Sequence, residues 1–293
     1  MHKKTAVLQI FLKLFFMVMC ILVVCPFILL ISVSISNETD IANYGYAFLP
    51  RQIDFSAYKY VLKNPQTIID AYGVTATFSI LSMVLGVLLM SMMAYPLSRK
   101  KLRGRTQLSF YLYFTMLFNG GMVPAYILIT RYLHLDDNIW VYIIPSLISP
   151  WYVFMIRTSF QSLPEEIIES AHVDGAEEYT IFFRIVLPLS KPILATVALF
   201  TLLLKWNDWM NSMLYINNPK LYSLQYLLQK IMANIQLLQN SEPGMTALQD
   251  LVEIPGETAR MAMAVIVAGP ALLVFPFFQK YFVKGITVGS VKG

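Results

Sequence analysis

The sequence predicts an all-α integral membrane protein with six transmembrane helices and both ends of the chain in the cytoplasm. Three observations predict this fold: the composition, the number of long apolar runs and the distribution of basic residues. Of the 293 residues, 57% are hydrophobic and 13% are charged, whereas a soluble domain carries about twice that charge. The mean hydropathy is +0.60. The composition therefore places the chain among integral membrane proteins.

Six apolar runs are long enough for transmembrane helices, which need about 20 mostly apolar residues. The third and fourth runs contain glycine and proline, and neighbouring helices can satisfy the backbone groups that such breaks leave free. No internal repeat or linker divides the sequence, so residues 1–293 are expected to form a single transmembrane domain. The predicted helices are Val7–Ile35, Tyr72–Leu97, Gln107–Ile129, Ile139–Phe160, Ile193–Leu214 and Ala259–Phe282.

Basic residues set the predicted orientation. The segment "SRKKLRGR" between the second and third runs carries five of them from Arg99 to Arg105, and lysines such as Lys4 and Lys284 stand near both ends of the chain. With six alternating helices all these groups fall on one side, which the positive-inside rule identifies as the cytoplasm. A segment of about residues 161–190 is then cytoplasmic, and the segment of about residues 215–258 is an outer loop.

The cytoplasmic segment of about residues 161–190 has an acidic first half and an apolar second half. "SLPE", which begins at Ser162, predicts a capping box at the start of a short helix that ends near His172. "VDGA" predicts a turn, after which Asp174 and Glu177 predict the cap of a second helix. An exposed helix–turn–helix of this kind is a docking surface for a partner. A loop that rests on lipid headgroups would instead favour Lys and Arg.

The spacing in this segment resembles the EAA loop of bacterial ABC importer permeases, whose signature is E-A-A, three residues, G, nine residues and I-x-L-P. Here Glu169-Ser170-Ala171 precedes Gly175 by three residues, and "IVLP" follows after nine more. The departure in this core is Ser170, where alanine is usual. The resemblance implies a type I importer permease whose coupling loop docks into a cleft of a cytoplasmic ATPase. The residues expected to couple the two subunits are Glu165, Glu166, Glu169, Ser170, Ala171, Asp174, Gly175, Leu187 and Pro188.

Other stretches resemble the carbohydrate-uptake branch of these permeases, and the smaller permease of maltose-type importers in particular. They are "NGGMVPAY", "KWNDWMNSMLYINNPKLYSLQ" and the tail "VKGITVGSVKG". The resemblance implies a multi-pass subunit of a bacterial cytoplasmic membrane, surrounded by lipid, that imports a carbohydrate, an oligosaccharide by the finer resemblance. A polyol, glycerol phosphate or peptide is the alternative solute. The implied partners are a second permease, two ATPase subunits and a solute-binding protein. The tail, residues 285–293, is expected to contact the ATPases through Gly289, Val291 and Lys292.

The stretch "KWNDW" places two charges inside the fifth apolar run. Lys205 and Asp208 are three residues apart, which predicts that they share a helix face with Trp209. Each charge costs about 2.5–3.5 kcal/mol at the middle of a membrane helix, so both are expected to avoid lipid. One interpretation is a substrate path lined by Lys205, Asp208, Trp209 and Asn119. The other interpretation is a polar packing node between helices.

The sequence predicts no catalytic, cofactor-binding or metal-ligating residue. It contains no G-x-x-x-x-G-K-[ST] loop, so ATP and Mg are expected to bind to the partner subunits and this chain is not expected to be an enzyme. The three histidines are too far apart to suggest a metal site, and the net charge of +5 is attributed to orientation rather than to nucleic-acid binding. The competing classes are an intramembrane enzyme, which needs a nucleophile and base, and a secondary transporter, which predicts two related halves.

Overall fold

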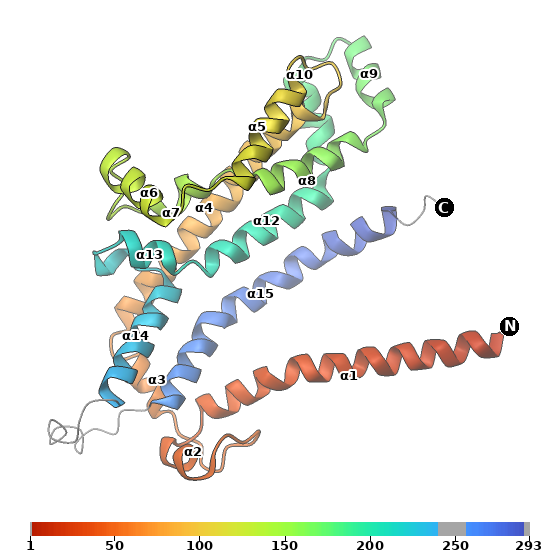
Figure 1. The fold of residues 1–293 in the computed structure, drawn as a ribbon. Helices are drawn as coiled ribbons and strands as arrows, with labels where there is room; N and C mark the ends of the chain where they lie inside the picture. Colours follow the sequence, from red (N-terminus) through yellow and green to blue (C-terminus); the bar gives the residue numbers. More distant parts are fainter. Residues whose placement is uncertain (1, 240–255, 290–293) are drawn as a thin grey trace. The chain divides into compact units, whose positions relative to one another are not determined.

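The computed structural model describes residues 2–239 and 256–289, and the regular structure in them is helical apart from one isolated bridge between Ser36 and Ile53. Figure 1 follows the helices along the chain. The chain divides into two compact units, Met1–Ile68 with Leu227–Pro270 and Ile69–Tyr226 with Ala271–Gly293. The predicted all-helical fold class is confirmed. The single domain stays a prediction.

The first unit contains the N-terminal helix α1 (His2–Ser34), whose apolar side chains between residues 8 and 24 are exposed, as expected of a helix that lipid surrounds. Asn37 caps the short helix α2 (Glu38–Tyr44) by accepting two backbone N–H groups of its first turn. The Glu38 carboxylate accepts the N–H groups of Glu257 at 2.8 Å and Thr258 at 2.9 Å. A carboxylate from α2 therefore caps the last helix, α15 (Glu257–Gly289). The other elements of this unit are α3 (Ser56–Val61), the first turn of α4 (Pro65–Ser98) and most of α14 (Leu224–Gln239).

The second unit contains most of α4 and the elements that follow it. Of these, α5 (Arg105–Leu117), α8 (Pro150–Gln161), α9 (Glu165–Val173), α10 (Glu178–Ile181) and α12 (Lys191–Trp206) position the candidate site. The remaining elements are α6 (Met122–Ile127), η1 (Leu128–Tyr132), α7 (Trp140–Ile143), η2 (Ile144–Ser146), η3 (Phe182–Val186), α11 (Leu187–Leu189), α13 (Met210–Tyr215) and η4 (Pro219–Leu221).

Three of the six predicted spans are continuous helices in the described part of the chain: Leu8–Ser34, Pro65–Ser98 and Glu257–Gln279. The third predicted span bends by 108° between Leu117 and Met122. Gly121 lies in this bend with φ +87, a backbone conformation that residues with a side chain avoid.

The other two predicted spans are also interrupted. The predicted fifth span, Ile193–Leu214, is interrupted between α12, which ends at Trp206, and α13, which begins at Met210. The 79° bend between Leu189 and Lys191 lies before this span. The predicted fourth span is broken at its prolines into α7, η2 and α8, because Pro145 and Pro150 each stand in the first turn of a new helix. The count of six spans and the orientation stay predictions.

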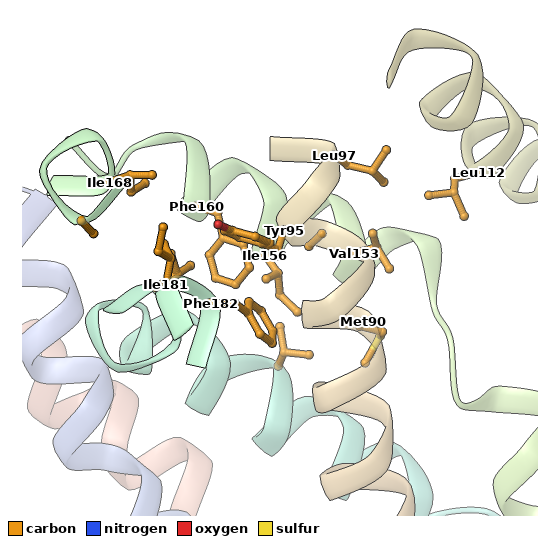
Figure 2. Close-up of a cluster of buried hydrophobic side chains, with 14 residues drawn as sticks. Met90, Tyr95, Leu97, Leu112, Val153, Ile156, Phe160, Ile168, Ile181 and Phe182 are labelled. Atoms are coloured by element: carbon orange, nitrogen blue, oxygen red, sulfur yellow. The ribbon is translucent and has the colours of Figure 1, made fainter. Parts of the chain in front are cut away.

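One buried cluster of the second unit joins α4, α8, α9 and α10 (Figure 2). Phe160 of α8 and Ile181 of α10 are 1% and 0% exposed, and the rings of Tyr95 and Phe182 lie with centroids 5.2 Å apart. From α9 the cluster takes Ile168 and Ala171. Because packed interiors transmit displacements, a movement of α9 is expected to reach the end of α4.

Candidate functional site

Helix α9 begins at Glu165, and Pro164 occupies its cap position with no side-chain hydrogen bond. The predicted capping box is therefore wrong. Ser162 is the C-terminal cap residue of the preceding helix α8, and its hydroxyl donates to the Ser159 carbonyl at 2.7 Å. Glu165 and Glu166 do lie in the first turn, where the helix dipole favours negative charge.

The two faces of α9 differ in burial. Ile168 and Ala171 are buried in the cluster of Figure 2, whereas Glu165, Glu166, Glu169 and Ser170 are exposed. Two side chains that sequence reasoning did not single out are also exposed: Val173, the last residue of α9, by 87%, and Tyr179 of α10 by 72%. An exposed surface of carboxylates and large apolar groups is what a protein partner covers.

The turn between α9 and α10 depends on Gly175. Its φ is +78, its N–H donates to the His172 carbonyl at 3.0 Å, and the next N–H, of Ala176, reaches the Ala171 carbonyl at 2.9 Å. Asp174 is the C-terminal cap residue that follows α9, so its predicted role as the cap of the second helix is wrong. Glu177 has the extended cap conformation there, without a side-chain hydrogen bond.

Glu178 connects three helices, and sequence reasoning missed it. One oxygen of its carboxylate accepts a hydrogen bond from the Tyr95 hydroxyl at the end of α4. The other oxygen lies 3.5 Å from Nε2 of His172 on α9. The guanidinium of Arg99 covers the Tyr95 ring at 4.7 Å. No local pattern could have indicated this contact, because Tyr95 and Glu178 are 83 residues apart.

Removing the Tyr95 hydroxyl is expected to loosen the attachment of α10 to α4. Tyr95→Phe should lower the free energy of unfolding by about 1 kcal/mol, because the bond is to a carboxylate that solvent also reaches. Unfolding of the detergent-solubilised subunit in a denaturant series measures the change. Tyr179→Phe is the matched control, since that ring is 72% exposed, and an equal loss in both variants would contradict the prediction.

The charged pair of the fifth predicted span is largely buried. Lys205 is 2% exposed, its Nζ donates to the Tyr142 carbonyl at 2.6 Å, and it lies 3.7 Å from Asp208 Oδ2. Asp208 also accepts the backbone N–H of Asn211 at 3.1 Å and its side-chain N–H at 2.6 Å. This network has the geometry of a polar packing node.

The predicted helix face of Lys205, Asp208 and Trp209 does not form. α12 ends at Trp206, and Trp209 is the residue before α13. Asp208 reaches Lys205 from the connection between the two helices. Trp209 is half-buried. Asn119 is exposed, and its side-chain oxygen accepts a hydrogen bond from the N–H of Gly121 at 2.8 Å. The substrate path lined by Lys205, Asp208, Trp209 and Asn119 stays a prediction.

Asp137 joins two segments that the predicted topology places on the outer side. It has φ +51, its N–H donates to the Tyr215 carbonyl at 2.9 Å, and its carboxylate accepts the N–H groups of Asn217 at 2.5 Å and Asn218 at 2.8 Å. The N–H groups of Asn218 and Asn217 hold the pKa of Asp137 below its ordinary value. A lowered carboxyl pKa stabilises the fold above the unfolded pKa of about 4, and this stabilisation is lost as the pH falls through the folded pKa.

Asp137→Asn is expected to lower the thermal unfolding midpoint at neutral pH, because the amide accepts these N–H groups without a charge. The difference from the unsubstituted protein should shrink as the pH falls below about 4. Thermal scans at several pH values measure it. Asp136→Asn, next to it and exposed, serves as the control, and a difference that persisted unchanged in acid would contradict the prediction.

The predicted tail contact is only partly within the described residues. Gly289 is the last residue of α15, whereas Val291 and Lys292 lie outside the described residues. The part of the predicted outer loop from 240 to 255 lies outside them as well. Within 2–239 and 256–289, no group of three or more His, Cys, Asp and Glu side chains is placed to hold a metal ion.

Long apolar helices together with an exposed acidic helix–turn–helix are typical of a membrane subunit that docks onto a partner. Residues 72–288 match the family described as "Binding-protein-dependent transport system inner membrane component". The chain belongs to this family, and the predicted resemblance to ABC importer permeases is confirmed. It is a membrane component of a transport system.

Three known proteins are similar to most of the chain. Protein LplC of Bacillus subtilis is 36% identical over 277 residues, which cover 92% of this chain and 90% of LplC. The polygalacturonan/rhamnogalacturonan transport system permease protein YtcP of the same organism is 35% identical and covers 95% of this chain and 96% of its own length. A solved bacterial ABC transporter that imports the acidic polysaccharide alginate has a chain with 29% identity and a TM-score of 0.80, covering 94% of this chain and 97% of that one.

Proposed function

We propose that this chain is a permease subunit of an ATP-driven ABC importer that moves an oligosaccharide from an external binding protein into the cytoplasm. The observation that carries the proposal is the exposed α9–Gly175–α10 segment with the EAA spacing in a chain of this family. The names of YtcP and of the alginate importer support a carbohydrate substrate. The same type of permease for a polyol, glycerol phosphate or peptide is the alternative.

The proposed assembly contains a second permease, two cytoplasmic ATPase subunits and a solute-binding protein. The ATPases bind ATP and Mg, and this chain supplies no catalytic group. The exposed Glu169 carboxylate is proposed to meet a basic residue of the ATPase, and closure of the ATPase pair then displaces α9. The cluster that joins α9 to α4 and α8 (Figure 2) gives this displacement a route into the transmembrane helices. The tail near Gly289, Val291 and Lys292 is proposed as a second ATPase contact.

We call the polar packing node of Lys205, Asp208 and Asn211 the Lys205 node. The side chains proposed to line the sugar path lie next to it in the sequence or in other exposed positions. Lys205 and Asp208 hold each other and their neighbours in the packing node. Asn207, in contrast, is exposed, and its side-chain oxygen accepts a hydrogen bond from Gln225 at 3.0 Å. An exposed amide pair can exchange its mutual bond for sugar hydroxyls. Trp209 offers the flat surface against which a sugar ring packs, and Asn119 is a further exposed amide.

A strain that lacks this chain tests the transport function. Uptake of a labelled oligosaccharide should fall to background and return when the gene is supplied again. Labelled polyol, glycerol phosphate and peptide are measured in parallel. Loss of one of these three, with oligosaccharide uptake intact, would replace the carbohydrate assignment by the alternative solute while leaving the importer intact.

Trp209→Ala is expected to lower oligosaccharide uptake about two- to tenfold, because packing of an aromatic ring contributes about 0.5–1.5 kcal/mol. Basal ATPase activity and assembly with the second permease should stay unchanged. Uptake by reconstituted vesicles measures the effect, with Trp151→Ala as the control since Trp151 is 61% exposed. If Trp209→Ala instead prevents assembly, Trp209 belongs to a packing node and not to a path.

A further inference from the structure

A polar cavity of about 360 Å³ lies where the basic segment after α4 meets α5 and α8. Its lining includes Lys100, Arg105 and Arg157, and no Asp or Glu of the described residues is part of it. We call it the Arg105–Arg157 cavity. A neighbouring cavity of about 330 Å³ shares Lys100 and Arg105 and adds Arg99 and Glu165. Lys100 has an exposed partner in Glu165 at 3.4 Å, so the uncompensated charge is that of the arginines.

Two guanidinium groups of this region have buried N–H donors without an acceptor among the described residues. Arg157 donates from Nη1 to the Ser109 hydroxyl at 3.0 Å, but its Nε is buried without a partner. The Nε and Nη2 atoms of Arg99 are in the same situation. A buried donor without an acceptor costs about 1–3 kcal/mol, and a guanidinium matches the oxygens of a phosphate or carboxylate.

The surface that continues from the cavity along α5 is apolar. Leu108 and Tyr111 are 51% and 66% exposed, and Phe110 and Phe114 of the same helix are exposed as well. α5 is part of the third predicted span, and the basic segment stands on its predicted cytoplasmic side, where the membrane leaflet carries anionic lipids. A ligand with a negative head and hydrocarbon chains fits such a junction.

We propose that the Arg105–Arg157 cavity binds the phosphate headgroup of an anionic phospholipid of the cytoplasmic leaflet. The phosphate accepts hydrogen bonds from the guanidinium groups of Arg105 and Arg157, and the acyl chains lie along the exposed apolar side chains of α5. A free phosphate ion shares the headgroup chemistry but gains nothing from the apolar surface. The lipid therefore holds the segment between α4 and α5 at the membrane surface next to α9.

The test uses the assembled transporter in nanodiscs that contain photoreactive phosphatidylglycerol or photoreactive phosphatidylcholine, with the labelled peptides identified by mass spectrometry. Phosphatidylglycerol should label residues 99–109 and 150–161, and phosphatidylcholine should not. Arg105→Gln and Arg157→Gln should each reduce the labelling about fivefold, since each basic residue near the membrane surface contributes about that factor. Lys191→Gln removes an exposed charge at the start of α12, outside the cavity, and should leave the labelling by phosphatidylglycerol unchanged.

Further variants and a competition measurement distinguish binding of the lipid from binding of other anions. Arg157→Lys keeps the positive charge but loses the planar guanidinium that donates two parallel hydrogen bonds. It should therefore retain more labelling than Arg157→Gln. Inorganic phosphate that competes with the lipid at equal concentration would identify a free-anion site and overturn the proposal. Equal labelling by both lipids would overturn it too. So would labelling that appears only when the ATPases are left out, because the cavity would then belong to that protein interface.

Discussion

Replacement of Gly175 by Val is expected to abolish oligosaccharide uptake while the permease still inserts into the membrane. Gly175 has φ +78, and a Cβ atom there would meet nothing within 4 Å. The cost of a side chain is therefore backbone strain alone, about 1–2 kcal/mol for an ordinary residue and more for a β-branched one. That strain is relieved when the exposed turn between α9 and α10 changes shape. Glu169 and Val173 would then no longer present the surface that the ATPase is proposed to bind.

The control for this variant is Gly45→Val. Gly45 has φ +76 and likewise meets nothing within 4 Å, but it follows α2 in the other unit. Its ψ of −174 lies in a region that is almost confined to glycine, so Gly45→Val should be strained as well and should keep uptake. Gly175→Asn should retain part of the activity, since asparagine tolerates positive φ better than valine. Uptake and copurification of the ATPase are measured for all three. Normal uptake with normal ATPase binding in Gly175→Val, or an equal loss in Gly45→Val, would contradict the prediction.

The structure of the α9–Gly175–α10 segment was predictable because its signals are local. The EAA spacing placed Glu169 and Gly175 correctly, on an exposed helix face and at a turn with positive φ. The predicted end of the first helix near His172 differs from the observed Val173 by a single residue. Helix periodicity, proline and glycine act within a few residues of one another, so a sequence can express them without knowledge of the fold.

The errors concern groups with competing partners. Ser162 matched a capping box, but the end of α8 is equally close and takes its hydroxyl. Asp208 was placed on a continuous helix, although α12 ends at Trp206 and the carboxylate approaches Lys205 from the connection that follows. The contact between Tyr95 and Glu178 depends on how α4 and α10 pack, and no pattern within either segment encodes it.

The two members of the Lys205 node depend on each other unequally. Lys205 is 2% exposed and has, besides Asp208, the Tyr142 carbonyl. The side chain of Asp208 is 11% exposed and has two N–H donors from Asn211. If Lys205 is removed, Asp208 keeps both donors and some water. If the charge of Asp208 is removed, an ammonium group remains buried with a single carbonyl.

Asp208→Asn is therefore expected to lower the free energy of unfolding by about 3–5 kcal/mol, the cost of leaving one member of a buried pair uncompensated. Lys205→Met is expected to lower it by less. The double variant should be more stable than Asp208→Asn, because it removes the unpaired charge and leaves only the Tyr142 carbonyl without its donor, at about 1 kcal/mol. Unfolding of the reconstituted subunit in a denaturant series gives all three free energies. A double variant whose loss equals the sum of the single losses would show that the 3.7 Å contact contributes nothing. Conversely, three variants of normal stability that fail only in sugar uptake would assign Lys205 and Asp208 to the transport path after all.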